Sequence, residues 1–142
     1  MWYTISMSLI KIALIQLDAQ DKVEANLTKT KQMIQEAASK GADWIALPEV
    51  FHFRKKVKAY SEPLDGPSIN LLKNLAKTHQ VTIFGGSIYE TGPDKKAYNT
   101  SVIIDKTGTI IATYRKINLF DKIVDGKEIK ESNSFHAGDS PV

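Results

Sequence analysis

The chain has 142 residues and a net charge of +3, with 42% hydrophobic and 25% charged residues. This length and composition exclude disorder and predict a single globular domain. So small a charge gives no indication of a nucleic-acid partner, and no apolar run reaches the roughly 18 residues of a membrane span.

The chain contains no cysteine, which excludes disulfides and metal sites built from thiolates. Its histidines, His52, His79 and His136, lack the spacing of metal ligands. The N-terminus has neither the basic nor the apolar segment of a secretory signal, so we expect a cytoplasmic protein. Residues 1–10 are predicted to form a loose extension.

The first half of the chain predicts a βαβ unit. An apolar run over residues 11–17 predicts a buried strand, and apolar residues at helical spacing over 23–38 predict a helix that stops at Gly41. Residues 43–47 predict a second strand, and this strand–helix–strand order favours a parallel pair. A second helix is predicted to begin at Gly66-Pro67 and to end near His79.

The second half of the chain predicts strands joined by short turns. Residues 81–84 and 87–90 predict one strand interrupted by Gly85-Gly86, a pair that marks a bulge or a close backbone approach. Residues 97–105 and 109–114 predict two more strands, which are antiparallel because the turns are too short for helices. The polar residues 121–132 predict a loop. We therefore predict an α/β fold with a mixed sheet and two helices on one sheet face.

A basic run, Arg54-Lys55-Lys56-Val57-Lys58, lies between the two predicted helices. One interpretation is a solvated loop or helix face. The other is a rim that attracts an anionic substrate.

Two ionisable residues stand at the ends of apolar runs, where protein scaffolds often place their chemistry. Glu49 follows the second predicted strand, and its carboxylate suits either a general base or a cap for backbone N–H groups. Lys116 follows the last predicted strand, and it suits either stabilisation of an oxyanion or simple exposure to solvent. The separation of the two residues in sequence does not by itself bring them together.

A series of short segments resembles the nitrilase, or carbon–nitrogen hydrolase, superfamily, and within it the Nit/ω-amidase branch. Each segment is a weak signal alone, but their number and order make the resemblance specific. Asn118 replaces a histidine that is common in the family. The segments are Ile12–Leu17, Asn26-Leu27, Ala46-Leu47-Pro48-Glu49, Gly66-Pro67, Gly85-Gly86-Ser87-Ile88, Tyr98-Asn99-Thr100-Ser101, Tyr114–Asp121, and Glu131-Ser132 followed by Gly138-Asp139.

This resemblance implies a Glu–Lys–Cys triad, with Glu49 as the general base and Lys116 stabilising the tetrahedral intermediate. It also implies that Glu131 supports the pocket and that Tyr114 and Asn99 are further pocket or supporting residues. In such enzymes the cysteine attacks a small amide or nitrile, ammonia or an amine leaves, and water hydrolyses the thioester. No metal and no organic cofactor are implied.

The resemblance covers about the first half of the family's domain, which is an α-β-β-α sandwich. The family's cysteine lies beyond the segment that matches Gly138-Asp139, and this chain has no cysteine. We therefore expect residues 1–142 to be the N-terminal part of a single carbon–nitrogen hydrolase domain that is inactive as given. We also expect the chain to form a homo-oligomer or to pair with a C-terminal half.

Two alternatives remain open. The chain is either a truncated, non-catalytic binding or assembly module of the same family, or an unrelated α/β domain that binds a nucleotide at a strand switch point. The absence of a glycine-rich loop after Leu17 counts against the nucleotide interpretation.

Overall fold

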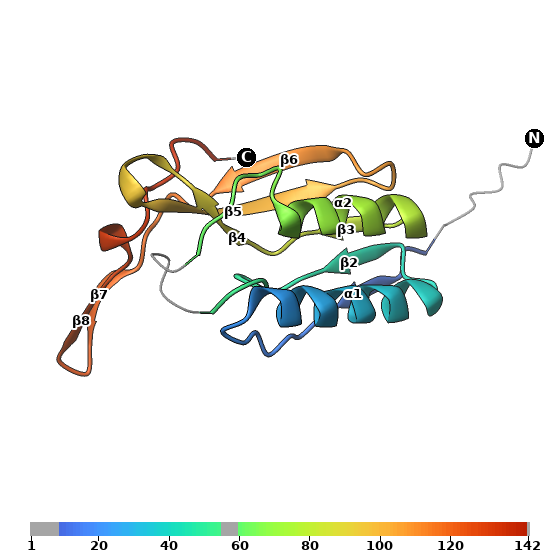
Figure 1. Cartoon of the computed structure of the whole chain (residues 1–142), viewed down its shortest axis with the longest axis horizontal. Helices are drawn as coiled ribbons and strands as arrows, with labels where there is room; N and C mark the ends of the chain where they lie inside the picture. Colours follow the sequence, from blue (N-terminus) through green and yellow to red (C-terminus); the bar gives the residue numbers. More distant parts are fainter. Residues whose placement is uncertain (1–8, 55–59, 142) are drawn as a thin grey trace, which may run out of the picture.

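The computed structural model describes residues 9–54 and 60–141. These residues form a six-stranded sheet, two α-helices and a two-stranded hairpin that extends away from the sheet (Figure 1). The elements are β1 (Ile12–Leu14), α1 (Val23–Ser39), β2 (Trp44–Ala46), α2 (Pro67–His79), β3 (Thr82–Phe84), β4 (Ile88–Thr91), β5 (Ala97–Ile104), β6 (Ile110–Arg115), β7 (Asp121–Val124) and β8 (Lys127–Lys130), with 3-10 turns at Pro93–Lys95 and Glu131–Asn133.

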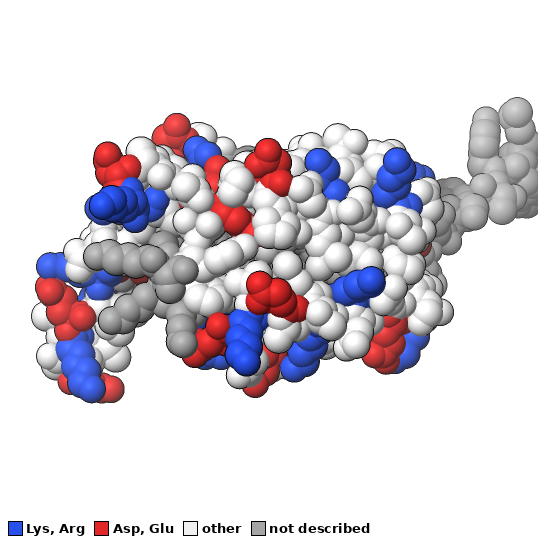
Figure 2. All heavy atoms as spheres, in the orientation of Figure 1, with Lys and Arg blue, Asp and Glu red and all other residues white. Residues whose placement is uncertain are grey.

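Part of two sequence predictions lies outside the described residues. Of the predicted extension over residues 1–10, only Leu9 and Ile10 are described, and they are 92% and 52% exposed. Of the basic run, only Arg54 is described. On the face seen in Figure 2, acidic and basic side chains are interspersed, with no block of one sign.

The sheet is mixed, as the turn lengths predict. β1 pairs with β2 and β2 with β3 in parallel, and a helix lies between the strands of each pair in the chain. β3 and β4 then pair antiparallel with successive parts of β5, and β6 pairs antiparallel with the other edge of β5. The strand predicted to be interrupted at Gly85-Gly86 is therefore β3 followed by β4.

Both helices cover the same face of the sheet and lie side by side (Figure 1). Pro67 occupies the first turn of α2, where its missing N–H costs nothing. Gly41 follows α1 with a φ of 79°, the left-handed conformation in which glycine ends helices. The buried core beneath the helices includes Ile34, Leu72, Ile45, Ile83 and Ile104, each 0% exposed.

The opposite face of the sheet is apolar and open. Residues in register form one apolar row across β1, β2, β3, β5 and β6, in which the end residue Leu14 is 82% exposed. The row consists of Leu14, Ala46, Phe84, Ile103 and Ala112. A single sheet with helices on one side leaves such a face for another layer to bury.

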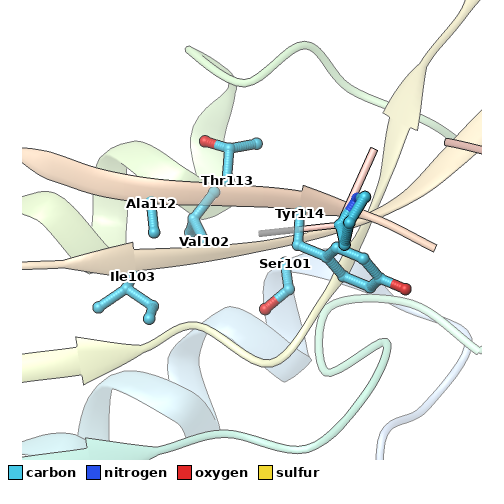
Figure 3. A pocket seen from close by; sticks show the side chains of 7 residues that line it. Ser101, Val102, Ile103, Ala112, Thr113 and Tyr114 are labelled. Carbon is cyan, nitrogen blue, oxygen red and sulfur yellow. The ribbon is translucent and has the colours of Figure 1, made fainter. Parts of the chain in front are cut away.

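A hollow of about 410 Å³ lies on the open face over β5 and β6. Figure 3 shows Ser101, Ile103, Ala112 and Tyr114 projecting from the two strands toward the same side. Pro141, near the end of the described chain, also lines this hollow.

The prediction of a loop over residues 121–132 is wrong, because most of this segment is the β7–β8 hairpin. Its turn residues Asp125 and Gly126 both have positive φ angles, 50° and 72°. Such angles are typical of the two-residue hairpin turn that Asp-Gly favours. Both strands are exposed throughout, so no alternation of buried residues marked them in the sequence.

Gly86 confirms the predicted close backbone approach. It has a φ of 56°, and a Cβ at this position would clash with the carbonyl oxygen of Pro48. The glycine therefore lets the β3–β4 connection lie directly against the segment that carries Glu49.

We predict that Gly86→Ala lowers the free energy of unfolding by about 3 kcal/mol, because the clash adds to the strain of the positive φ. Gly41→Ala is the matched control, since Gly41 has a φ of 79° but the nearest neighbour of an added Cβ is Lys11 Nζ at 3.5 Å. We expect this control to lose only about 1 kcal/mol. Urea unfolding followed by circular dichroism measures both losses, and equal losses would contradict the close approach.

Candidate active site

The end of β2 places Glu49 in a turn that is fixed from two sides. The backbone N–H of Leu47 donates to the carbonyl oxygen of Phe84 at 2.9 Å. Val50, directly after Glu49, has a φ of 52°, a conformation that costs a β-branched residue about 1–3 kcal/mol. Its N–H donates to Ser87 Oγ at 3.0 Å, which helps to hold the strained turn.

The end of β6 places Lys116, and hydrogen bonds hold its backbone on both sides. Its N–H donates to the carbonyl oxygen of Asn99 at 2.9 Å, and its own carbonyl oxygen accepts from the N–H of Gly138 at 2.9 Å. A Cβ at Gly138 would clash with the carbonyl oxygen of Arg115, so this close contact requires glycine.

The structure brings together four of the five site residues predicted from the sequence. Glu49 and Glu131 lie beside the ammonium group of Lys116, and Asn99 contacts Glu49. Lys116 Nζ lies 3.6 Å from Glu49 Oε1 and 3.0 Å from Glu131 Oε2. Asn99 Nδ2 donates to Glu49 Oε1 at 2.7 Å. Glu131 Oε2 also accepts from the N–H of Phe120 at 2.7 Å, which fixes this carboxylate at the base of the hairpin.

A hollow of about 220 Å³ opens beside these groups. The fifth predicted residue, Tyr114, lines it, and the Tyr114 hydroxyl oxygen accepts from the N–H of Ile117 at 3.4 Å. Gly86, Ser87 and Ser101 complete the lining with Glu49, Asn99 and Lys116. This hollow, called the polar hollow below because all of its lining residues except Gly86 have polar side chains, has room for a small group such as a carboxamide.

The electrostatics keep Lys116 cationic. Burial lowers the pKa of Lys116, but its hydrogen bonds and the charges of Glu131 and Glu49 outweigh burial, so the pKa is raised. A protonated amine is no nucleophile, but it suits the stabilisation of a developing oxyanion. The Glu49 side chain is 63% exposed, so its carboxylate is open to solvent.

His52 lies close to Glu49 in sequence but is packed in the protein interior. It is fully buried among aromatic rings, those of Phe51, Tyr60 and Tyr89. Burial lowers the pKa of His52 to about 4, so its imidazole is neutral at pH 7. Its Nε2 faces the backbone N–H of Tyr89 at 3.4 Å.

Within residues 9–54 and 60–141, no group of three or more His, Cys, Asp or Glu side chains is arranged to hold a metal ion. Neither α1 nor α2 is long and apolar enough to cross a bilayer.

Two residues near the site, Ser87 and Tyr89, were not assigned a role from the sequence, and Arg54 was considered only as part of the basic run. Ser87 holds the Val50 turn, and Arg54 and Tyr89 line a second hollow that also touches Glu49. The position of Ser87 directly after two glycines, and that of Arg54 at the head of the basic run, were usable signals. Tyr89 carried no signal, because a tyrosine in a strand is ordinary.

The chain belongs to the carbon–nitrogen hydrolase family, which its residues 11–142 match. It resembles human omega-amidase NIT2, with 38% identity over 138 residues that cover 94% of this chain and 50% of that protein. It is also 36% identical over 140 residues to the chloroplastic omega-amidase of Arabidopsis thaliana, covering 92% of this chain and 38% of the relative.

Solved structures agree with this assignment. The Caenorhabditis elegans NitFhit protein superposes with a TM-score of 0.80 at 28% identity, covering 94% of this chain and 35% of that one. Saccharomyces cerevisiae Nit3, of the nitrilase superfamily, gives a TM-score of 0.77 at 31% identity, covering 92% and 49%. The family and fold class predicted from the sequence are thus confirmed. The chain spans about half the length of the curated relatives it matches.

We predict that Glu131→Gln lowers the pKa of Lys116. The neutral amide removes the closest of the negative charges that raise the pKa of Lys116. Burial of the ammonium group, which lowers that pKa, remains. An NMR pH titration of the lysine side-chain resonances measures the change. Glu128→Gln, which removes an exposed carboxylate paired with Lys130 on the hairpin, is the control and should leave the Lys116 titration unchanged.

Proposed function

We propose that this chain forms the part of an amide hydrolase that carries the general base and the oxyanion-stabilising cation. The observation that supports this proposal most directly is the position of Lys116 Nζ, which lies 3.6 Å from Glu49 and 3.0 Å from Glu131 beside the small polar hollow. The omega-amidase names of relatives support an amide as the substrate, with a nitrile as the other member of the class.

In this proposal, the nucleophile is a thiol from outside the 142 residues, since these contain no cysteine. Glu49 takes the thiol proton, and the sulfur attacks the amide carbon. The Lys116 ammonium stabilises the resulting oxyanion, and Glu49 returns the proton to the leaving nitrogen, so that ammonia departs and a thioester remains. Glu49 then deprotonates a water molecule, which attacks the thioester and releases the acid and the thiol.

The remaining site residues have supporting roles in this mechanism. Glu131 holds the Lys116 ammonium group in place, and Asn99 orients the Glu49 carboxylate through its 2.7 Å hydrogen bond. Tyr114 forms a wall of the hollow. The chemistry uses neither a metal nor an organic cofactor, and we place the protein in the cytoplasm.

A second candidate function is a non-catalytic binding or assembly module of the same family. The absence of cysteine and the open position of the Glu49 carboxylate favour it. In that case the polar hollow binds an amide without hydrolysing it.

We predict that the 142-residue chain releases no ammonia from small monoamides above the level of its Glu49→Gln variant. Without a thiol the acyl-enzyme cannot form, and binding and electrostatics alone leave at most residual catalysis. A coupled ammonia assay checks this. Turnover by the unsubstituted chain that the Glu49→Gln variant lacks would contradict the requirement for an external nucleophile.

We further predict that the open sheet face makes the chain associate or bind an apolar dye. The driving force is removal of the exposed apolar row from water, which a second copy or a C-terminal half would provide. Leu14→Lys should reduce both effects. Ile111→Lys is the control and should reduce neither, because Ile111 is also exposed, at 60%, but directly precedes Ala112 of the row and so points to the opposite face of the sheet. Light scattering and dye fluorescence measure them, and a dye-free monomer would contradict the prediction.

A further inference from the structure

A fully buried histidine connects the segment after Glu49 to two other parts of the fold. His52 is 0% exposed and follows the Val50 turn in the chain. The uncharged side-chain amide of Asn26 in α1 donates from Nδ2 to the carbonyl oxygen of His52 at 2.9 Å. His52 Nε2 accepts the backbone N–H of Tyr89 in β4 at 3.4 Å. The segment is therefore tied to α1 through the backbone of His52 and to β4 through its side chain.

The contact with Tyr89 requires a neutral imidazole. Nε2 can accept a hydrogen bond only when it is unprotonated, so the neutral ring carries its proton on Nδ1. Within residues 9–54 and 60–141, Nδ1 has no hydrogen-bond partner. A second proton would turn Nε2 into a donor that faces the N–H of Tyr89, and it would place a positive charge in the protein interior. Protonation of His52 therefore opposes the contact twice.

The described neighbours of the imidazole do not balance such a charge. The ring centroids of Tyr60 and Tyr89 lie 5.7 and 5.4 Å from that of His52. Both phenols are neutral at and below pH 7, because burial and nearby carboxylates raise the pKa of each tyrosine. The Glu62 carboxylate is already engaged, since it accepts from the Tyr60 hydroxyl at 2.6 Å and from the N–H of Ser68 at 3.2 Å. Burial thus dominates, and it lowers the pKa of His52 from 6.5 to about 4.

We propose that His52 is an acid-sensitive latch, whose neutral imidazole holds residues 51–53 against β4 and whose protonation releases them together with the Val50 turn. This turn is the strained one, with a φ of 52° at Val50. Its release would move Glu49 away from Asn99 and Lys116, so acid would take the candidate site apart. The latch goes beyond the proposed function, because it follows from packing and holds whether or not the site is catalytic.

The direction and the range of the effect follow from the pKa of His52. The buried imidazole takes up a proton less readily than a released one, so a fall in pH favours the released form. The effect begins near the ordinary pKa of 6.5 and levels off below about 4, where the closed form is protonated too. Between these limits the released population should grow about tenfold per pH unit.

Amide hydrogen exchange of the 142-residue chain, followed by NMR from pH 7 to pH 4, tests the latch. We expect the protection factors of the Tyr89 and Val50 amides to fall about tenfold per pH unit below pH 6.5. The Leu47 amide, which donates to Phe84 on the other side of Glu49, should stay more strongly protected at every pH. Equal protection of all three amides would show global unfolding and overturn a local latch.

Three variants separate protonation of His52 from the titration of carboxylates. His52→Gln offers an amide oxygen to the Tyr89 N–H but takes up no proton in this range, so it should remove the part of the pH dependence that the histidine adds. His52→Phe has no acceptor, so it should lower Tyr89 protection at pH 7 and be equally insensitive to acid. His136→Gln is the matched control, at a histidine that packs against Tyr98 instead, and should keep the full pH dependence. A pH dependence that survives both His52 substitutions overturns the proposal.

The imidazole resonances give a test that needs no substitution. In the unsubstituted chain, the nitrogen shifts of His52 should show the Nδ1–H tautomer at pH 7 and a midpoint well below 6.5. The Nε2–H tautomer, or a midpoint near 6.5, would show that the imidazole does not hold β4 and would overturn the latch.

Discussion

One residue of β5 holds the two halves of the candidate site together. The backbone carbonyl oxygen of Asn99 accepts the N–H of Lys116 at 2.9 Å, and its side-chain Nδ2 donates to Glu49 Oε1 at 2.7 Å. Glu49 and Lys116 follow strands that do not pair with each other, β2 and β6. Asn99, buried to 6% exposure in a strand that pairs with β3, β4 and β6, supplies the rigid link between them.

Buried charge reinforces the strand end that carries Lys116. Arg115, the residue before it, donates from Nε and Nη2 to the two oxygens of Glu90, at 2.8 and 2.5 Å. Burial raises the pKa of Glu90, but the bonds from Arg115 and Thr100 outweigh burial, and the carboxylate stays ionised. Such a two-point clamp fixes the orientation of the Arg115 side chain and so ties the strand end before Lys116 to β4. The lysine is thus held by β4 as well as by β5.

The sequence predicted the elements of the sheet better than the contacts between them. Apolar runs and turn lengths were enough to predict the parallel and antiparallel parts of the sheet. The exposed hairpin was not predicted, because only its Asp125-Gly126 turn carried a signal. The resemblance to the carbon–nitrogen hydrolase family, and not the spacing in the sequence, indicated that Glu49 and Lys116 belong to one site. Their 3.6 Å separation depends on the β5–β6 register and on Val50 at a φ of 52°, which no residue propensity favours.

The open sheet face and the open site are two aspects of one arrangement. The hollow over β5 and β6 shares Ser101 and Tyr114 with the polar hollow beside Lys116. A layer that buries the apolar row must therefore also approach the Glu49 carboxylate, which is now 63% exposed. Excluding water there strengthens the attraction between Lys116 and a developing oxyanion. Under the proposed function, covering this face and completing the active site are the same event.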